Sequence, residues 1–240
     1  RQMCIRDRIG RARFWTPLRA IIAVAYVFLS FGVLSKSHCA GGRPDDNGIV
    51  QLNWDGNRQF TAACYNDIIP LYGARGLDQP GFVYDYSWVE DGLTRYMEYP
   101  VLAGMFQQLC ATISRWTYFL VDSFLPESGW YFYVTALLMS IIWVITIRMV
   151  AELAGNRIWD TLLVAGSPLL IVHAFTNWDI PSIFFAVAAM LAARNKRWWL
   201  AGIMIGLGTA FKLWPIFLLG AYLTVAIRKR NLAPVSYTHL

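Results

Sequence analysis

The chain has 240 residues, of which 57% are hydrophobic and 15% are charged, and its formal net charge is +6. Soluble globular domains carry about 25% charged residues, so this composition argues against a disordered chain, a coiled coil and an ordinary water-soluble enzyme. Several apolar stretches approach the roughly 20 residues that a helix needs to cross a bilayer. No basic stripe interleaved with aromatic side chains is present, so the excess positive charge indicates orientation in a membrane rather than binding to nucleic acid.

Both ends of the chain differ from the rest. Residues 1–8 (RQMCIRDR) and 235–240 (VSYTHL) follow no recognisable pattern and resemble translated sequencing-adaptor read-through. We treat both stretches as artefacts and leave them out of the reasoning about fold. We expect that the natural protein continues past Pro234, which makes this chain an N-terminal fragment.

The first predicted transmembrane helix covers residues 16–36. Basic residues at positions 11, 13 and 19 place its start in the cytoplasm, because positive charge is retained on that side. A signal peptide is the competing interpretation, but no clean small-residue cleavage site follows the apolar stretch. The next segment is polar and rich in acidic residues, and we expect residues 37–129 to form a large extracytoplasmic loop.

An amphipathic helix is predicted within this loop, near residues 101–120. Apolar residues recur there at helical spacing, and Gln107 and Gln108 lie on the other face. We expect this helix to lie in the membrane interface. If it crossed the bilayer, the basic residues that follow the later helices would fall outside the cytoplasm.

Transmembrane helices two to six are predicted within residues 130–230. The last apolar stretch is long enough for one crossing, but that would bury Lys212 near the bilayer centre, at a cost of at least about 2.5 kcal/mol. Two short helices with a turn near 212–215 avoid this cost. The apolar stretches are 130–147, 158–175, 180–193 and 198–227. The predicted fold is therefore an all-α integral membrane protein, a polytopic helical bundle with a large outer loop and an interfacial amphipathic helix.

Two cysteines, Cys39 and Cys64, share the predicted outer loop. A disulfide between them would close a loop of about 25 residues and contribute roughly 3 kcal/mol in an oxidising compartment. Two unpaired thiols are the alternative. No cysteine spacing typical of a metal site is present, so we predict no metal ligands.

Residues able to carry chemistry fall in the outer loop and at the outer ends of the later helices. They are Asp67 with Tyr72, Glu98-Tyr99-Pro100, His173, Asn177-Trp178-Asp179 and Lys212-Leu213-Trp214-Pro215. Each has a plain structural alternative. Glu98 would gain from the dipole of the next helix, and Asp179 would cap a helix that starts near Pro181. Lys212 would reach toward the interface.

The order and spacing of these motifs resemble the C-type glycosyltransferase superfamily. They are more closely similar to glycosyltransferase family 87, the polyprenol-phosphate-mannose-dependent mannosyltransferases. That family commonly has two prolines after the tyrosine, where this chain has Pro100 and Val101. The resemblance implies transfer of a sugar, mannose in that family, from a polyprenyl-phosphate donor to a cell-envelope glycolipid or glycan.

The same resemblance implies a multi-pass protein of the bacterial cytoplasmic membrane, with its N-terminus in the cytoplasm and its active site on the outer face. The expected partners are the donor, the acceptor and membrane lipids, with no nucleic acid. No cofactor is implied, and metal dependence stays open.

Roles follow from the needs of glycosyl transfer. Asp67 is the predicted catalytic base for the acceptor hydroxyl, and Asp179 is the second catalytic carboxylate. Lys212 and Arg95 are the predicted contacts to the departing phosphate. The other predicted substrate-binding residues are Glu98, Tyr99, His173 and Asn177.

Two other classes of protein remain open at this point. A transporter or lipid flippase would also carry an intramembrane lysine and a broken final helix, but rarely so long an acidic outer loop. A non-catalytic envelope-assembly partner would tolerate the loss of both Asp67 and Lys212.

Overall fold

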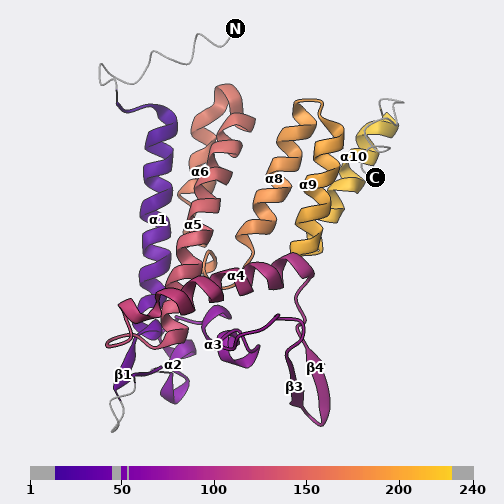
Figure 1. Ribbon diagram of the computed structural model, residues 1–240. Helices are drawn as coiled ribbons and strands as arrows, with labels where there is room; N and C mark the ends of the chain where they lie inside the picture. The colour runs from indigo at the N-terminus through magenta and orange to yellow at the C-terminus, as the bar shows by residue number, and fades with distance from the viewer. Residues whose placement is uncertain (1–13, 45–49, 53, 229–240) are drawn as a thin grey trace.

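The computed structural model describes residues 14–44, 50–52 and 54–228, and these form a largely helical molecule (Figure 1). The presumed artefacts at 1–8 and 235–240 lie outside the described residues. In chain order the elements are α1 (Pro17–Ala40), β1 (Gly42–Pro44), β2 (Val50–Leu52), η1 (Asp55–Asn57), α2 (Arg58–Thr61), α3 (Ile68–Ala74), β3 (Ser87–Glu90), β4 (Leu93–Tyr96), α4 (Val101–Thr117), η2 (Tyr118–Leu120), α5 (Glu127–Ala154), η3 (Gly155–Thr161), α6 (Leu162–Ala165), α7 (Pro168–His173), α8 (Ile180–Arg194), α9 (Trp198–Phe211), η4 (Trp214–Ile216) and α10 (Phe217–Arg228).

Helix α1 begins close to its predicted start and runs four residues past its predicted end. The Thr16 hydroxyl accepts a hydrogen bond from the backbone N–H of Arg19 at 3.3 Å, and Pro17 occupies the first turn, where no N–H is needed. One stripe of the helix is buried against α5, α6 and α7. Its members are Ile21, Ala25, Leu29, Gly32, Lys36, Cys39 and Ala40.

Helix α4 lies across the ends of the other helices, as Figure 1 shows. Its small and polar side packs on the protein through Ala103, Gly104, Gln107, Cys110, Ala111 and Ser114. Its larger apolar residues are exposed, among them Val101, Met105, Leu109 and Trp116. The amphipathic pattern is therefore present, but Gln107 is buried against neighbouring elements. Small residues favour this arrangement because they let two helices approach closely.

Helix α5 extends beyond its predicted range of 130–147 at both ends. The stretch predicted as one helix over 158–175 is instead divided into η3, α6 and α7. The break falls at Gly166, Ser167 and Pro168, because proline cannot continue a helix from the preceding turn. The Ser167 hydroxyl accepts from the N–H of Leu169 at 3.3 Å and starts α7.

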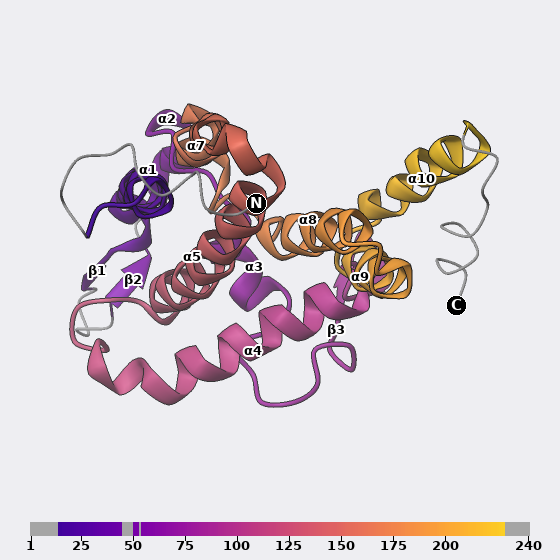
Figure 2. The same cartoon turned by 90° about the horizontal axis from the view of Figure 1, so that it is seen from above.

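The last apolar segment forms two helices, α9 and α10, joined through Lys212 and η4. Within the described residues, two helical stretches, Pro17–Ala40 and Glu127–Ala165, are long and apolar enough to cross a bilayer by length and composition. Three later apolar helices, Ile180–Arg194, Trp198–Phe211 and Trp214–Arg228, are shorter than the roughly 20 residues of a full span. Seen from above in Figure 2, α4 runs alongside the row formed by α5, α8 and α9, and α10 extends away from it.

The loop elements gather at the end of the bundle where α1 ends and α5 begins (Figure 1). Two antiparallel hairpins, β1–β2 and β3–β4, form there together with α2 and α3. In the second hairpin the turn residues Asp91 and Gly92 have φ of 53° and 75°, which is the turn chemistry that two-residue hairpins favour. The main core joins α1, α3, α5 and α7, and its largest fully buried side chains include Tyr72, Tyr131, Phe132, Phe175 and Trp178.

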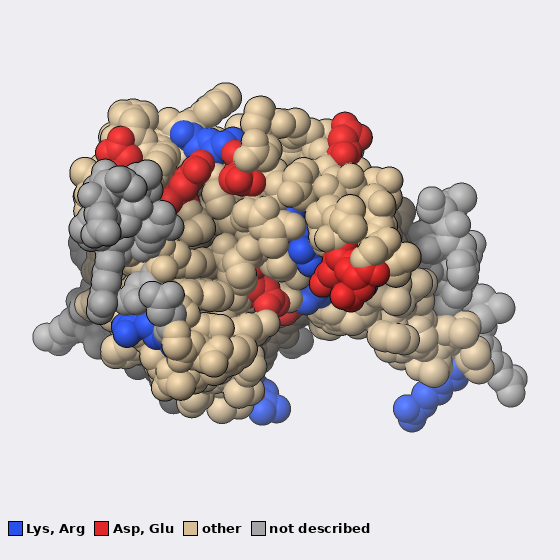
Figure 3. Space-filling view, turned by 90° about the horizontal axis from the view of Figure 1, so that it is seen from below, with Lys and Arg blue, Asp and Glu red and all other residues tan. Residues whose placement is uncertain are grey.

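The two ends of the bundle differ in charge. At the top of Figure 1 lie the start of α1, the end of α5, the connection from α8 to α9 and the end of α10. The sequence has basic residues in or next to these segments, namely Arg19, Arg148, Arg157, Arg194, Lys196, Arg197 and Arg228. The acidic residues of the loops and of the turn before α8 lie at the opposite end. Figure 3 views that face and shows acidic side chains spread over it, with basic side chains between them.

Candidate active site

Asp67 is held at the junction between the outer loop and the chain segment that precedes α8. Its backbone N–H donates to the carbonyl oxygen of Thr176 at 2.8 Å. Its carboxylate accepts two side-chain hydrogen bonds, from the Tyr65 hydroxyl at 2.6 Å and from the Asn177 amide at 3.1 Å. Two predicted site residues, Asp67 and Asn177, thus meet although 110 positions separate them in the sequence.

Tyr99 lies beside this pair. Its ring packs edge-on against Trp178, with ring centroids 5.4 Å apart. Burial and the nearby carboxylates of Asp67 and Glu98 raise the pKa of Tyr99 to about 12. The hydroxyl therefore keeps its proton at any physiological pH and is available as a hydrogen-bond donor near the Asp67 carboxylate.

The Asn177-Trp178-Asp179 motif places a buried ring between two polar side chains. Trp178 is 1% exposed and anchors the segment in the core. On the other side of it, the Asp179 carboxylate forms an ion pair with the ammonium group of Lys212. The alternative in which Asp179 caps α8 is not realised, because its side chain accepts no capping hydrogen bond. Asp179 and Lys212, both predicted site residues, are therefore direct partners.

A cleft of about 590 Å³ reaches this ion pair from the side of the bundle. His173 and Asp179 are its titratable lining residues. The other lining residues are Trp143, Leu163, Val164, Ser167, Leu169, Leu170, Ala174, Ile180, Ile183 and Trp214. Leu163 and Leu169 are 80% and 67% exposed, so the apolar wall continues onto the outer surface of the helices.

Glu98 and Arg95 have other partners. The Glu98 carboxylate accepts from the Arg75 guanidinium at 2.8–2.9 Å, and that guanidinium lies 4.0 Å from the centre of the Trp88 ring. Arg95 pairs with Glu90 at 3.0 Å across the second hairpin. Among the described residues, Arg95 forms no ion pair or hydrogen bond with Asp67, Asp179 or Lys212.

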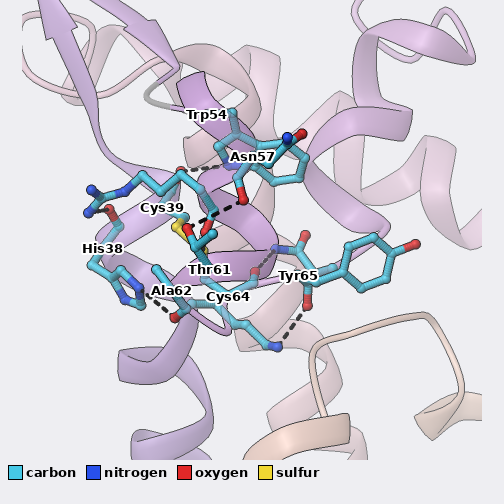
Figure 4. The surroundings of a disulfide bond; sticks show 11 residues. His38, Cys39, Trp54, Asn57, Thr61, Ala62, Cys64 and Tyr65 are labelled. Carbon is cyan, nitrogen blue, oxygen red and sulfur yellow. Dashed lines mark hydrogen bonds between the residues drawn. A yellow bond between two sulfur atoms is a disulfide. The ribbon is translucent and has the colours of Figure 1, made fainter.

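Cys39 and Cys64 form a disulfide, with Cα atoms 6.2 Å apart (Figure 4). The ring nitrogen of His38 lies near both sulfur atoms and contacts the carbonyl oxygen of Ala62 at 3.2 Å. Metal ions bind the thiolate form of cysteine. While the two sulfurs are bonded to each other, this cluster is therefore not a suitable metal site.

Sequence reasoning missed several residues that organise the site. Tyr65 stands two positions before Asp67, so its closeness in the sequence was an available signal. For Arg75 and Lys36, the neighbouring sequence gave no signal of a role in the site. Lys36 lies on the buried stripe of a membrane helix, and its partner, the carbonyl oxygen of Tyr65 at 2.7 Å, belongs to a distant loop.

The fold and the site define a helical membrane protein with carboxylates and a lysine at one end of its bundle, and with an apolar cleft that leads to them. Residues 100–238 match the family model of Glycosyltransferase family 87. Because this match covers more than half of the chain, the protein belongs to glycosyltransferase family 87 and is a membrane glycosyltransferase. No match was found among curated proteins or among solved structures. The matched region contains His173, Asn177, Asp179 and Lys212, and it begins after Asp67.

Proposed function

We propose that this protein transfers mannose from a polyprenyl-phosphate donor to a hydroxyl group of a cell-envelope glycolipid or glycan. The observation that carries the proposal is the cleft, whose apolar walls end at Asp179 and its partner Lys212. A polyprenyl phosphate has the matching chemistry, a long apolar chain joined to an anionic group. Apolar walls with a few placed polar groups are typical of small-molecule sites.

Asp67 is the proposed general base. The two hydrogen bonds that its carboxylate accepts hold it in a fixed position. The base takes the proton of the acceptor hydroxyl while that oxygen attacks the anomeric carbon. The bond from this carbon to the phosphate oxygen breaks in the same step, so the anomeric configuration inverts and polyprenyl phosphate leaves as an anion.

Lys212 is the proposed cation for the departing phosphate, since a fixed positive charge stabilises an anion that develops in the transition state. Asp179, its partner, is proposed to hold the ammonium group in place and serves as the second carboxylate of the site. His173 lines the cleft, where it is proposed to hydrogen-bond the sugar. Glu98 and Arg95 would have to leave their present ion pairs to contact substrate.

The charge distribution supports a multi-pass arrangement in the bacterial cytoplasmic membrane. Basic residues gather at the bundle end that would face the cytoplasm, as the positive-inside tendency requires. The N-terminus would then lie in the cytoplasm, and Asp67 on the outer face. The exposed apolar side of α4, with Met105, Leu109 and Trp116, fits a helix lying in the outer interface.

The test is a transfer assay on membranes that contain the complete reading frame. Labelled polyprenyl-phosphate mannose is supplied, and mannose incorporated into lipid is measured for the wild type and for Asp67→Asn. We expect the variant to lose about 10²–10⁴-fold in rate, the usual contribution of a general base. Asp85→Asn, an exposed loop acid, is the matched control and should keep full activity.

Each other outcome has a definite meaning. Full transfer by Asp67→Asn would exclude this residue as the base and direct the search to Asp179 and Glu98. No transfer by a well-folded wild type would reject mannose as the sugar, and other polyprenyl-phosphate sugars would be tried in the same assay.

A further inference from the structure

Lys36 is a buried cation whose contact is directed at the segment that carries Asp67. It is 3% exposed, on the buried stripe of α1. Its ammonium group donates to the carbonyl oxygen of Tyr65 at 2.7 Å. Within the described part of the chain it has no acidic partner. Burying a charged group costs free energy unless that group is paired or hydrogen-bonded. A lysine at this buried position therefore indicates a function that an apolar residue could not perform.

The disulfide forms a second tie between the same two segments. Cys39 lies three residues after Lys36 on α1, and Cys64 directly precedes Tyr65. Figure 4 shows the disulfide together with Trp54 and Tyr65. The indole N–H of Trp54 donates to the carbonyl oxygen of Cys39 at 3.0 Å and braces the α1 side of the disulfide.

Further hydrogen bonds carry this restraint from Cys64 to Asp67. The buried Asn66 amide donates to the carbonyl oxygen of Cys64 at 3.1 Å, and its oxygen accepts from the backbone N–H of Ile69 at 2.9 Å. The hydroxyl of Tyr65 then binds the Asp67 carboxylate itself. Every residue from Cys64 to Asp67 is thus tied, directly or through its neighbour, to the end of α1 or to the start of α3.

We propose that Lys36 and the Cys39–Cys64 disulfide are positioning groups for glycosyl transfer, which hold the segment 64–67 so that the Asp67 carboxylate faces the acceptor hydroxyl. This proposal rests on the proposed role of Asp67 as the base. Neither group touches substrate. A displacement of about 1 Å at a reacting group can cost about 10²-fold in rate, so loosening this segment lowers turnover without removing a substrate contact. Activity then depends on an oxidised disulfide.

The experiment compares steady-state kinetics of Lys36→Met, Lys36→Arg and the double variant Cys39→Ser/Cys64→Ser in the complete protein. We expect Lys36→Met and the double variant to lose about 10²-fold in kcat, with the donor KM changed by less than about twofold. Lys36→Arg should regain part of the rate, because it still donates to a carbonyl oxygen. Cys110→Ala, at the buried cysteine outside this cluster, is the matched control and should behave as wild type.

Hydrogen exchange separates a loosened segment from general damage, because it does not depend on activity. Peptides covering 64–69 should exchange faster in Lys36→Met, whereas peptides from α4 should not change.

The outcomes distinguish the two proposals. Wild-type kcat and unchanged exchange in Lys36→Met and in the double variant would overturn the positioning role. Faster exchange with undiminished kcat would do the same, while leaving Asp67 as the base. Full activity of Asp67→Asn would overturn both, because nothing catalytic would then depend on the placement of this carboxylate.

Discussion

At the scale of single residues, the ion pair between Asp179 and Lys212 is central to the proposed binding of the donor phosphate. Their side chains are 45% and 29% exposed, and exposed ion pairs contribute only about 0.2–1 kcal/mol to stability. The pair is therefore weak enough to open or to share its lysine with a phosphate. We therefore expect the loss of this positive charge to affect the proposed binding and catalysis more than the stability of the fold.

Replacing Lys212 tests this directly. We expect Lys212→Met to raise the donor KM or lower kcat so that kcat/KM falls at least about tenfold, with a stability change below about 1 kcal/mol. Lys212→Arg should retain more activity, since it keeps the charge. Transfer kinetics and thermal unfolding in detergent measure the two effects. A variant with normal kcat/KM would remove Lys212 from the site.

At the scale of elements, the end of α1 and the start of α5 meet at a glycine. A Cβ atom at Gly129 would collide with the carbonyl oxygen of Ala40. A rigid backbone atom cannot yield as a side chain would, so α5 can approach α1 this closely only without a side chain. A Cβ atom at Gly208 would lie 3.1 Å from side-chain atoms of Phe185 and Pro215, whereas a Cβ atom at Gly206 would meet nothing within 4 Å. Close packing thus explains Gly208 but not Gly206.

Gly129→Ala should therefore destabilise the protein by about 1–3 kcal/mol, the usual cost of overpacking. Gly206→Ala is the matched control, where the added methyl meets open space and alanine is the better helix former. Thermal unfolding of both variants in the same detergent measures the difference. Equal stability of the two variants would mean that α1 and α5 can separate at this point without cost.

At the scale of the whole molecule, the cleft joins the polar site to the side of the bundle. The helices α5, α6, α7 and α8 contribute its walls, together with η4. Because exposed apolar residues continue the wall, the lipid chain of the proposed donor would enter the cleft from the bilayer, and its phosphate would stay near Lys212. The division of the predicted 158–175 helix is what shapes this wall, since α6 and α7 place residues on both sides of the break.

Narrowing the cleft should discriminate between donors by chain length. We expect Val164→Trp to raise KM about tenfold for a long polyprenyl-phosphate donor and to leave a short-chain analogue unaffected, because only the long chain occupies the cleft. Leu137→Trp, an exposed α5 residue outside the lining, is the control. Equal effects on both donors would place the lipid chain elsewhere.

Much of this architecture was predictable because it depends on the hydrophobicity and the periodicity of residues that are close together in the sequence. The apolar content of α1 and α5 identifies membrane helices, and the 3.6-residue period predicts α4. The cost of placing Lys212 near the bilayer centre predicts the turn after Phe211. The order of motifs around Tyr99, Asn177 and Lys212 resembles the family to which the chain belongs. Each of these signals is carried by residues close together in the sequence.

The tertiary structure alone decided the pairings. Asp67 meets Asn177 because the residues just before α3 and just before α8 are joined by a backbone hydrogen bond from Asp67 to Thr176, and Lys36 meets Tyr65 because the last turns of α1 contact the loop. Tertiary packing also decided which side of α4 faces the protein, namely the side with small and polar residues. Sequence by itself determined that this is a helical membrane protein with its polar residues at helix ends, since hydrophobicity and helix period act locally. Which carboxylate, amide and lysine face one another was decided by long-range packing, because no local pattern records the partner of a buried polar group.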